Sequence, residues 1–211
     1  MESNPLINDL IVILTTSISN KENTITDTEY RKELYSSNIL KWLEYTLYPI
    51  VVIESSGYNF PEINHERLYK YSFEFDDNIK LTHSGDKEIY SLSFVLDKIK
   101  DLDIYKNCSH ILKVTGRYYL EGIEAVLTSV PLHKELYLQF HRYDDIKYQH
   151  SEYFGMKKEL LNNFVSDYYN LNGELMEQKL WGFSINKDKW HIGYFNNKIK
   201  RGGDNMLITK L

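Results

Sequence analysis

The sequence predicts an α/β fold in which a mostly parallel central sheet is flanked by helices, within a single domain of 211 residues. Short, mainly apolar runs rich in β-branched residues recur at Leu10–Leu14, Ile50–Ile53 and His110–Val114. Segments with helical spacing separate these runs. Because strands that alternate with helices imply right-handed crossovers, we expect neighbouring strands to run parallel.

The N-terminal part predicts a strand, a helix and a second strand. Leu10–Leu14 is apolar at every position, as expected of a strand covered on both faces. A helix over 27–47 follows, because Thr26 and Glu29 form a capping box and apolar residues then recur at helical spacing. Ile50–Ile53 is the second buried strand.

The middle of the chain repeats this order. Residues 69–75 alternate well enough for a third strand. Residues 86–100 carry one apolar stripe and form the clearest helix. His110–Val114 is the fourth strand.

The C-terminal part is less regular. The alternation over 136–140 predicts an antiparallel addition to the sheet, and Met156, Leu160 and Phe164 predict another helix. A last helix is expected to start near 172–174. The end of the single domain 1–211, residues 198–211, is expected to be a mobile tail or a link to a further domain.

Composition narrows the function classes. The net charge of −5 disfavours a general nucleic-acid binder, which needs a basic surface. The only cysteine, Cys108, cannot form an internal disulfide, and the apolar run 6–14 is too short for a transmembrane segment or a signal peptide. We therefore expect a cytoplasmic protein without a transmembrane segment.

Polar residues follow four predicted strands, where the ligand site of an open α/β sheet forms. Loops converge at the carboxyl ends of parallel strands, and helix N-termini present free N–H groups there. The four segments are 15–17, 54–56, 74–77 and 115–117. We expect a ligand to bind at this edge of the sheet.

Several catalytic motifs are absent from the sequence. Without a P-loop or a Gly-x-Gly-x-x-Gly fingerprint, ordinary ATPases and typical nicotinamide enzymes are disfavoured. Neither a Gly-x-Ser-x-Gly nucleophile elbow nor a Cys/His zinc spacing is present.

The segments that remain share a pattern: the strand end 11–17, Arg31 in the first helix, 52–56, the helix 85–99 and the strand 111–119. Together they resemble the GT-A fold of nucleotide-sugar glycosyltransferases, over roughly residues 8–185. The resemblance is closest to transferases that build surface polysaccharides in bacteria and large DNA viruses, where a strand ending Lys-x-Thr-Gly-Arg-Tyr recurs. It implies a GT-A-like, Rossmann-like sheet and, for a viral protein, the host cytoplasm.

The resemblance also implies a nucleotide site. The residues that would surround the base and ribose are Thr15, Thr16, Ser17, Arg31, Glu54 and Ser55. A carboxylate can accept a hydrogen bond from a ribose hydroxyl or a uracil N–H. Ser84 and Lys87 open a helix whose dipole and cation would hold pyrophosphate. Turn chemistry, a solvated helix face and ordinary helix capping explain the same residues without a ligand.

The resembled family binds Mn²⁺ or Mg²⁺ through an Asp-x-Asp motif after the fourth strand, so that the metal neutralises the leaving diphosphate. This sequence has Thr115, Gly116 and Arg117 there. Two options follow. Either Arg117 itself offsets the diphosphate charge, or acidic residues elsewhere carry the metal.

Asp76 and Asp77 are the best acidic candidates for that metal, because they follow a strand and provide two hard oxygen ligands. His191 is similar to a histidine that some members supply late in the chain as a third ligand. Asp144 and Asp145 form a second acidic pair, beyond a peripheral strand. A solvated acidic turn and a structural histidine are the alternative interpretations.

The resemblance implies a catalytic Asp or Glu near the start of a late helix, where an inverting transferase needs a general base. Glu177 occupies that place, and Glu174 lies three residues away on nearly the same face. The sequence does not separate the two. Ordinary acidic residues of a first helical turn are the alternative.

The expected function is therefore transfer of a hexosyl or deoxyhexosyl group from a nucleoside diphosphate donor, a UDP-sugar, to a glycan acceptor in surface or capsid glycan synthesis. Two alternatives stay open. One is a catalytically inactive carbohydrate- or nucleotide-binding module, and the other is a sugar nucleotidyltransferase.

Overall fold

The computed structural model describes residues 9–19, 25–75, 84–130, 134–138, 142–143, 145–166, 176–185 and 189–192. Its elements are, in chain order, β1 (Leu10–Thr16), α1 (Ile25–Tyr45), β2 (Ile50–Glu54), β3 (Leu68–Ser72), α2 (Ser84–Ile99), α3 (Asp103–Asn107), β4 (His110–Thr115), α4 (Ile123–Ser129), β5 (Leu136–Leu138), β6 (Arg142–Tyr143), β7 (Tyr148–Gln149), β8 (Tyr153–Lys157), α5 (Lys158–Ser166), α6 (Met176–Phe183) and β9 (Trp190–Ile192).

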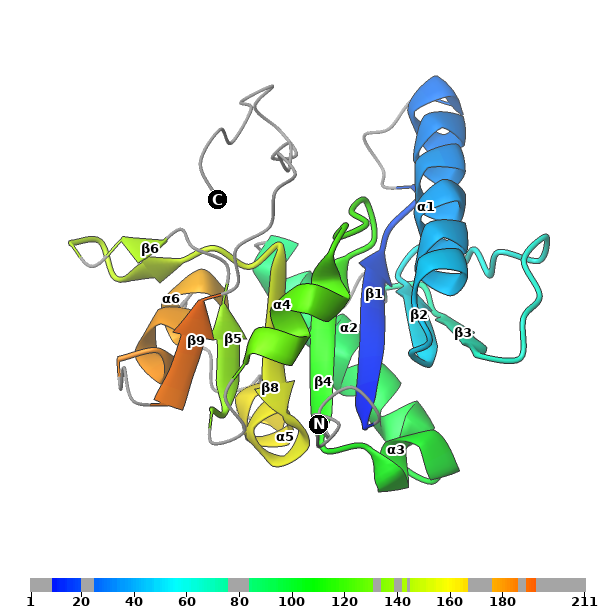
Figure 1. Ribbon diagram of the computed structural model, residues 1–211. Coiled ribbons are helices and arrows are strands. Elements are labelled where there is room, and N and C mark those ends of the chain that lie inside the picture. The colour runs from blue at the N-terminus through cyan, green and yellow to red at the C-terminus, as the bar shows by residue number, and fades with distance from the viewer. Residues whose placement is uncertain are drawn as a thin grey trace.

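A seven-stranded sheet in the order β3-β2-β1-β4-β8-β5-β9 forms the centre of the molecule (Figure 1). The pairings make six strands run in one direction, and β8 alone runs against them. The two short strands β6 and β7 pair separately. The predicted mostly parallel central sheet is therefore confirmed.

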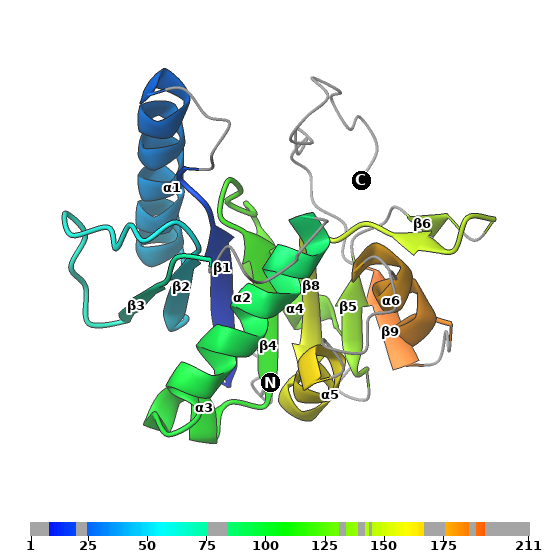
Figure 2. The same ribbon diagram turned by 180° about the vertical axis from the view of Figure 1, so that it is seen from behind.

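Helices cover both faces of the sheet, which is why β1 and β2 are apolar except at their carboxyl ends. In β1, Leu10, Val12 and Leu14 pack with α1 and α4 on one face. Ile11 and Ile13 point the other way, towards α2, α3, α5 and α6. Figures 1 and 2 show these two helical layers from opposite sides. Successive side chains of a strand alternate between faces, so a run without polar positions indicates burial on both.

The C-terminal half corrects two sequence predictions. Met156 does not open a helix but lies in β8, and α5 begins at Lys158. The segment 136–138 forms β5, which runs parallel to β1–β4, so the antiparallel member of the sheet is β8. The prediction failed because β8 leads directly into α5. Apolar residues then fall at 156, 160 and 164, and a single helix produces the same spacing.

Two other predictions lie partly or wholly outside the described residues. The last helix, α6, is described from Met176, beyond the expected start at 172–174. The expected tail, 198–211, is outside the described part of the chain. Among the helices of the described residues, none combines the length and the apolar character needed to cross a membrane.

Gly155 allows β8 to lie beneath a tyrosine ring. A Cβ at this position would lie 2.3 Å from Cδ2 of Tyr137, whose side chain is buried on the neighbouring strand β5. The ring therefore occupies the space that any larger residue would need. Gly182, on α6, has no atom within 4 Å of the same position.

We predict that Gly155→Ala lowers the free energy of unfolding by about 1–3 kcal/mol, because the buried Tyr137 ring must move. The matched control Gly182→Ala should stabilise the protein by up to ~1 kcal/mol, because alanine favours a helix more than glycine does. Equilibrium unfolding in denaturant measures both changes. Equal stability of Gly155→Ala and wild type would contradict the described packing of β8.

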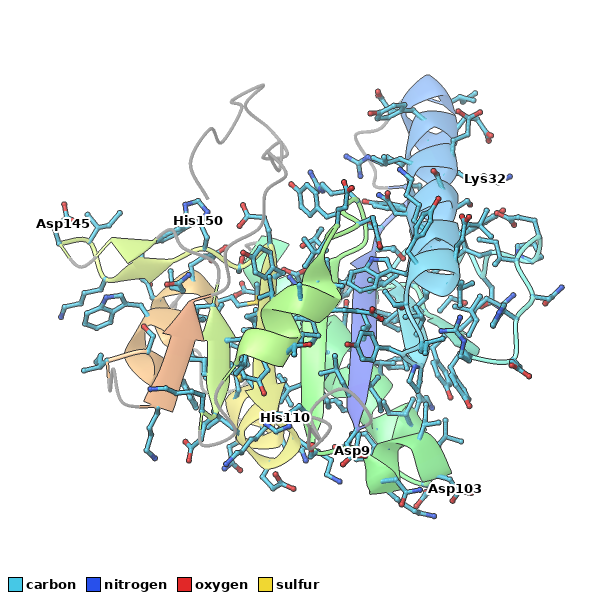
Figure 3. All side chains as sticks on the ribbon, viewed as in Figure 1. Asp9, Lys32, Asp103, His110, Asp145 and His150 are labelled. Atoms are coloured by element: carbon cyan, nitrogen blue, oxygen red, sulfur yellow. The ribbon has the colours of Figure 1, made fainter. Side chains whose placement is uncertain are left out.

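His110 opens β4 at the end of the sheet opposite His150 (Figure 3). Its ring is 6% exposed, stacks on Tyr137 with centroids 5.6 Å apart, and leaves Nε2 without a hydrogen-bond partner. Burial lowers the pKa of His110 to about 4, and the charge of Lys157 acts in the same direction. The carboxylates of Glu159 and Asp9 oppose this shift. The folded protein therefore holds His110 neutral.

The pKa of His110 is lower in the folded protein than its ordinary value of 6.5, so the unfolded chain binds a proton that the folded chain does not. Stability is lost as the pH falls from about 6.5 to about 4. We expect His110→Phe, which retains an aromatic ring, to remove roughly 3 kcal/mol of this loss. The free energies of unfolding of wild type and His110→Phe at several pH values test this prediction. The same pH dependence in both proteins would refute it.

Candidate functional site

The ends of β1, β2 and β4 lie side by side, as the sequence predicts. Thr15 is in register with Thr115, and Thr16 with Glu54. Gly116 follows directly, and its N–H donates to the Thr15 carbonyl at 2.8 Å. A Cβ at Gly116 would lie 2.4 Å from Cγ2 of Thr16, so glycine is what lets the chain leave β4 against β1.

Glu54 holds the ends of β1 and β2 together. Its fully buried carboxylate accepts hydrogen bonds from the N–H groups of Ile18, Ser56 and Tyr58 at 2.8 Å, and from the Ser56 hydroxyl at 2.6 Å. Both oxygens are thus engaged by the protein. The predicted contact of Glu54 with a nucleotide stays a prediction.

Thr16 and Ser55 bond to the same strand ends. The Thr16 hydroxyl donates to the Ile53 carbonyl at 3.1 Å, and the Ser55 hydroxyl donates to the Thr16 carbonyl at 3.2 Å. The Ser17 hydroxyl donates to the Ser19 carbonyl at 3.4 Å. These hydrogen bonds lie at the edge of the sheet where we expect a ligand. Contacts of Thr16, Ser17 and Ser55 with a nucleotide stay predictions.

Two guanidinium groups, of Arg31 and Arg117, act electrostatically on Tyr35 at the side of the site covered by α1. Arg31 donates from Nη1 to the Ser17 carbonyl at 3.2 Å. Tyr35, which is 4% exposed, lies within electrostatic range of both Arg31 and Arg117. Burial raises the pKa of Tyr35, whereas these two positive charges act to lower it. The edge therefore combines two positive charges that are far apart in the sequence.

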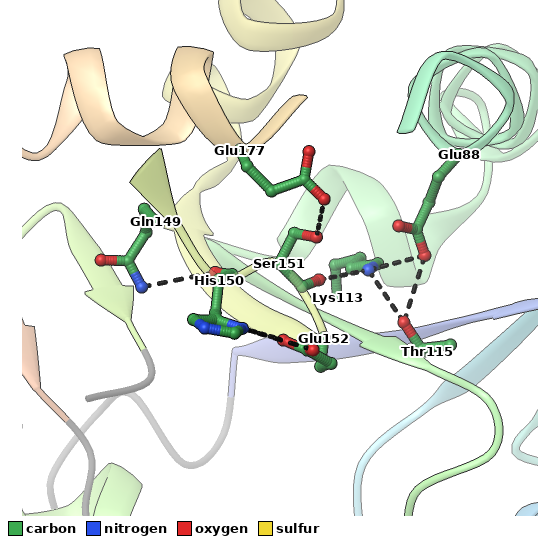
Figure 4. A network of polar contacts seen from close by, with 8 residues as sticks. All are labelled: Glu88, Lys113, Thr115, Gln149, His150, Ser151, Glu152 and Glu177. Carbon is green, nitrogen blue, oxygen red and sulfur yellow. Dashed lines mark hydrogen bonds and ion pairs between the residues drawn. The ribbon is translucent and has the colours of Figure 1, made fainter. Parts of the chain in front are cut away.

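An ion pair between Lys113 and Glu88 lies between β4 and α2 (Figure 4). The Lys113 side chain is fully buried, and its Nζ lies 2.6 Å from Oε1 of Glu88. Nζ also donates to the Ser151 carbonyl at 2.6 Å and to the Thr115 hydroxyl at 3.2 Å. This one ammonium therefore links α2, β4 and the segment before β8.

Glu88 concentrates its contacts on one oxygen. Oε1 accepts hydrogen bonds from the hydroxyls of Thr15, at 2.5 Å, and Thr115, at 3.3 Å, in addition to its ion pair with Lys113. The side chain is 18% exposed. The predicted site residues Thr15 and Thr115 are thus tied to a carboxylate that the sequence did not single out.

Glu177 lies across the site from Glu88, on the first turn of α6 (Figure 4). Its Oε1 accepts a hydrogen bond from the Ser151 hydroxyl at 2.9 Å. Its Oε2 lies 3.5 Å from where a Cβ would stand on Gly85, so it faces the N-terminal turn of α2. The half-buried carboxylate is thus beside the helix end that the sequence assigned to pyrophosphate.

His150 and Glu152 flank Ser151 in the same segment. Nδ1 of His150 lies 3.3 Å and 3.4 Å from the two carboxylate oxygens of Glu152. The Glu152 carbonyl accepts from the Thr115 N–H at 2.7 Å, which fixes the segment against the end of β4. Because β8 is antiparallel, its start lies at the same edge as the ends of its neighbours.

The predicted pyrophosphate residues begin α2. Ser84 is its first residue. Lys87 is exposed, and its Nζ lies 5.8 Å from the ring centroid of Phe75. Their contact with a ligand is untested.

The metal candidates are only partly described. Asp76 and Asp77, together with Glu174, lie outside the described residues. Within the described part of the chain, no group of three or more His, Cys, Asp or Glu side chains could hold a metal ion. His191 lies in β9, and β3, which precedes Asp76, is the opposite edge strand. Six inter-strand steps, roughly 29 Å, separate β3 from β9.

Sequence reasoning assigned no role to Lys113, Glu88 or the segment 150–152. One signal was present: a lysine in a strand that is otherwise buried must find a partner, and Glu88 shares the inner side of the most regular helix. No comparable signal marks Ser151, because its place depends on the antiparallel entry of β8.

The sequence matches no protein-family model and no curated protein. Many solved structures match the chain, and two of them illustrate the shared fold. One is a protein described as a nucleotide-diphospho-sugar transferase from Desulfovibrio desulfuricans, with a TM-score of 0.52, 10% identity, and coverage of 87% of this chain and 78% of that chain. The other is a glycosyltransferase involved in the glycosylation of the major capsid of PBCV-1, with a TM-score of 0.50, 8% identity, and coverage of 87% and 80%. The GT-A-like fold class is thereby confirmed.

We predict that Lys113→Met lowers the free energy of unfolding by about 3 kcal/mol, the lower end of the range for a broken buried pair, because Glu88 retains some contact with water. Lys113→Met combined with Glu88→Gln should be less destabilised than Lys113→Met alone, because no unpaired charge is left behind. Equilibrium unfolding of Lys113→Met, Glu88→Gln and the double variant tests this. A double variant as unstable as the sum of the two single variants would show that the two side chains do not interact.

Proposed function

We propose that the protein is a glycosyltransferase that moves a hexosyl or deoxyhexosyl group from a nucleoside diphosphate, a UDP-sugar, to a hydroxyl of a glycan acceptor. The proposal is carried by two guanidinium groups that act on one buried tyrosine, and by a half-buried carboxylate, at the strand-end edge of a fold shared with a nucleotide-diphospho-sugar transferase. The acceptor belongs to a surface or capsid glycan, and transfer takes place in the cytoplasm.

The two arginines suit the diphosphate of such a donor. A guanidinium presents several N–H donors in a planar arrangement and stays charged at all relevant pH values. Arg31 and Arg117 approach the same buried tyrosine from α1 and from the end of β4. In this proposal they offset the charge that develops on the leaving diphosphate.

Glu177 is the proposed general base, and transfer inverts the anomeric configuration. As the acceptor oxygen bonds to the anomeric carbon, its proton passes to the Glu177 carboxylate. The bond from the anomeric carbon to the diphosphate breaks, and the nucleoside diphosphate leaves with the electron pair. The position of Glu177 at the ligand edge, with one oxygen facing the start of α2, supports this role.

A Mn²⁺ or Mg²⁺ ion held by Asp76 and Asp77 belongs to the proposal as an aid to diphosphate departure. When bound, such an ion supplies Lewis-acid stabilisation of the leaving group. His191 stays a candidate third ligand of this proposed ion.

We expect UDP or a UDP-sugar, with Mn²⁺ present, to raise the thermal unfolding midpoint of the protein, because a ligand that binds only the folded state stabilises it. Thermal shift measurements with UDP, GDP, CMP and dTDP compounds, with and without Mn²⁺, test the donor class. The absence of a shift with every nucleotide would defeat the proposal.

Glu177→Gln should lower kcat by about 10²–10⁴-fold while nucleotide binding is kept, because the amide cannot take the proton. Glu159→Gln is the matched control, because Glu159 is an exposed first-turn acid of α5. Release of nucleoside diphosphate in the presence of glycan acceptors measures the rate. Full activity of Glu177→Gln would remove Glu177 from the mechanism, and nucleotide binding without any transfer would favour a binding module.

A further inference from the structure

The proposed base is joined to the centre of the sheet by a short chain of hydrogen bonds (Figure 4). The Ser151 hydroxyl donates to Oε1 of Glu177 at 2.9 Å, and the Ser151 carbonyl accepts from Nζ of Lys113 at 2.6 Å. Lys113 in turn pairs with Glu88 at 2.6 Å. One residue, Ser151, thus contacts the base with its side chain and the buried ion pair with its backbone.

We propose that Ser151 is a positioning residue, which fixes Oε1 of Glu177 so that Oε2 is the oxygen that takes the proton of the acceptor hydroxyl. Lys113 anchors Ser151 by holding its peptide group. This inference rests on the proposed glycosyl transfer and adds a residue to it.

The backbone of Ser151 is held firmly enough for this task. Its side chain is 9% exposed, and its carbonyl is bonded to an ammonium that is itself fully buried. On the next residue, the Glu152 carbonyl accepts from the Thr115 N–H at 2.7 Å. The hydroxyl therefore projects from a fixed peptide, and only its side-chain rotamer has to be ordered.

The direction of the hydrogen bond assigns Oε1 of Glu177 to the Ser151 hydroxyl. A serine hydroxyl next to a carboxylate donates its hydrogen, so Oε1 is an acceptor and is occupied. Oε2 faces the first turn of α2, where Gly85 has no side chain to cover it. Free N–H groups at a helix N-terminus favour a negative charge at that place. Ser151 keeps its own proton during the transfer.

The charged groups on the surrounding elements are consistent with a Glu177 carboxylate that is hydrogen-bonded through Oε1 and takes the proton on Oε2. Glu88 on α2 is neutralised by Lys113, and Glu152 lies against His150. Each of these carboxylates has a basic partner close by. The hydrogen bond described for Glu177 comes instead from a neutral hydroxyl, which orients the carboxylate.

A double-mutant cycle tests the inference, using Ser151→Ala, Glu177→Gln and the combined variant of the full chain. Ser151→Ala should lower kcat by about 10–100-fold, the loss expected for one hydrogen bond to a charged group, with the KM for the UDP-sugar unchanged. In the Glu177→Gln background, removal of the Ser151 hydroxyl should change kcat by no more than about twofold, because Ser151 acts only through Glu177.

Two further variants show whether a lower kcat of Ser151→Ala comes from a general loss of structure. Ser151→Thr retains a hydroxyl and should keep kcat within about fivefold of wild type. Ser184→Ala removes another buried serine, whose hydroxyl donates to the Trp181 carbonyl at 2.8 Å near the end of α6, and should leave kcat unchanged. Equilibrium unfolding establishes that each variant is folded under the assay conditions.

The outcomes separate this inference from the proposed function. Wild-type protein that transfers no sugar overturns both. If wild type is active and Glu177→Gln is not, an unchanged kcat for Ser151→Ala overturns the role of Ser151 alone. Losses that multiply fully in the combined variant, or a Ser151→Thr variant as slow as Ser151→Ala, overturn it as well.

Discussion

The buried ammonium of Lys113 is the interaction on which the geometry of the ligand edge depends. An ammonium that is removed from water must have its donors satisfied, and Lys113 finds its partners on three separate elements. Glu88 brings in α2, Thr115 belongs to β4, and the Ser151 carbonyl belongs to the segment before β8. The position of each element is thereby fixed relative to the others at the point where a ligand would bind.

The carboxylates at this edge differ in how far the protein itself uses them. Both oxygens of Glu54 accept hydrogen bonds from the chain, which makes it a structural link between two strands. Glu88 has its contacts on Oε1. Among the described residues, Ser151 donates one hydrogen bond to Glu177, which is half-buried. Among the described contacts, Glu177 has the fewest internal partners of the three, which supports the proposal that it acts as the general base.

The antiparallel direction of β8 brings one more segment of the chain to the site. A parallel strand beside β4 would carry its own carboxyl end to this edge, whereas antiparallel β8 presents its start and the residues that precede it. His150, Ser151 and Glu152 reach the ligand edge for that reason. Gly155 permits β8 to lie beside β5, because the Tyr137 ring of β5 occupies the space that a side chain at position 155 would need.

The sequence by itself determined the α/β class, the buried strands β1, β2 and β4, the helices between them, and the polar strand ends. Periodicity and β-branched composition are local properties, so residues such as Val12 or Ile89 specify their environment without knowledge of distant segments. Only the tertiary structure decided the direction of β8, the pairing of Lys113 with Glu88, and the approach of Ser151 to Glu177. These contacts join residues 25 to 47 positions apart, and which groups meet at such separations depends on how the elements pack.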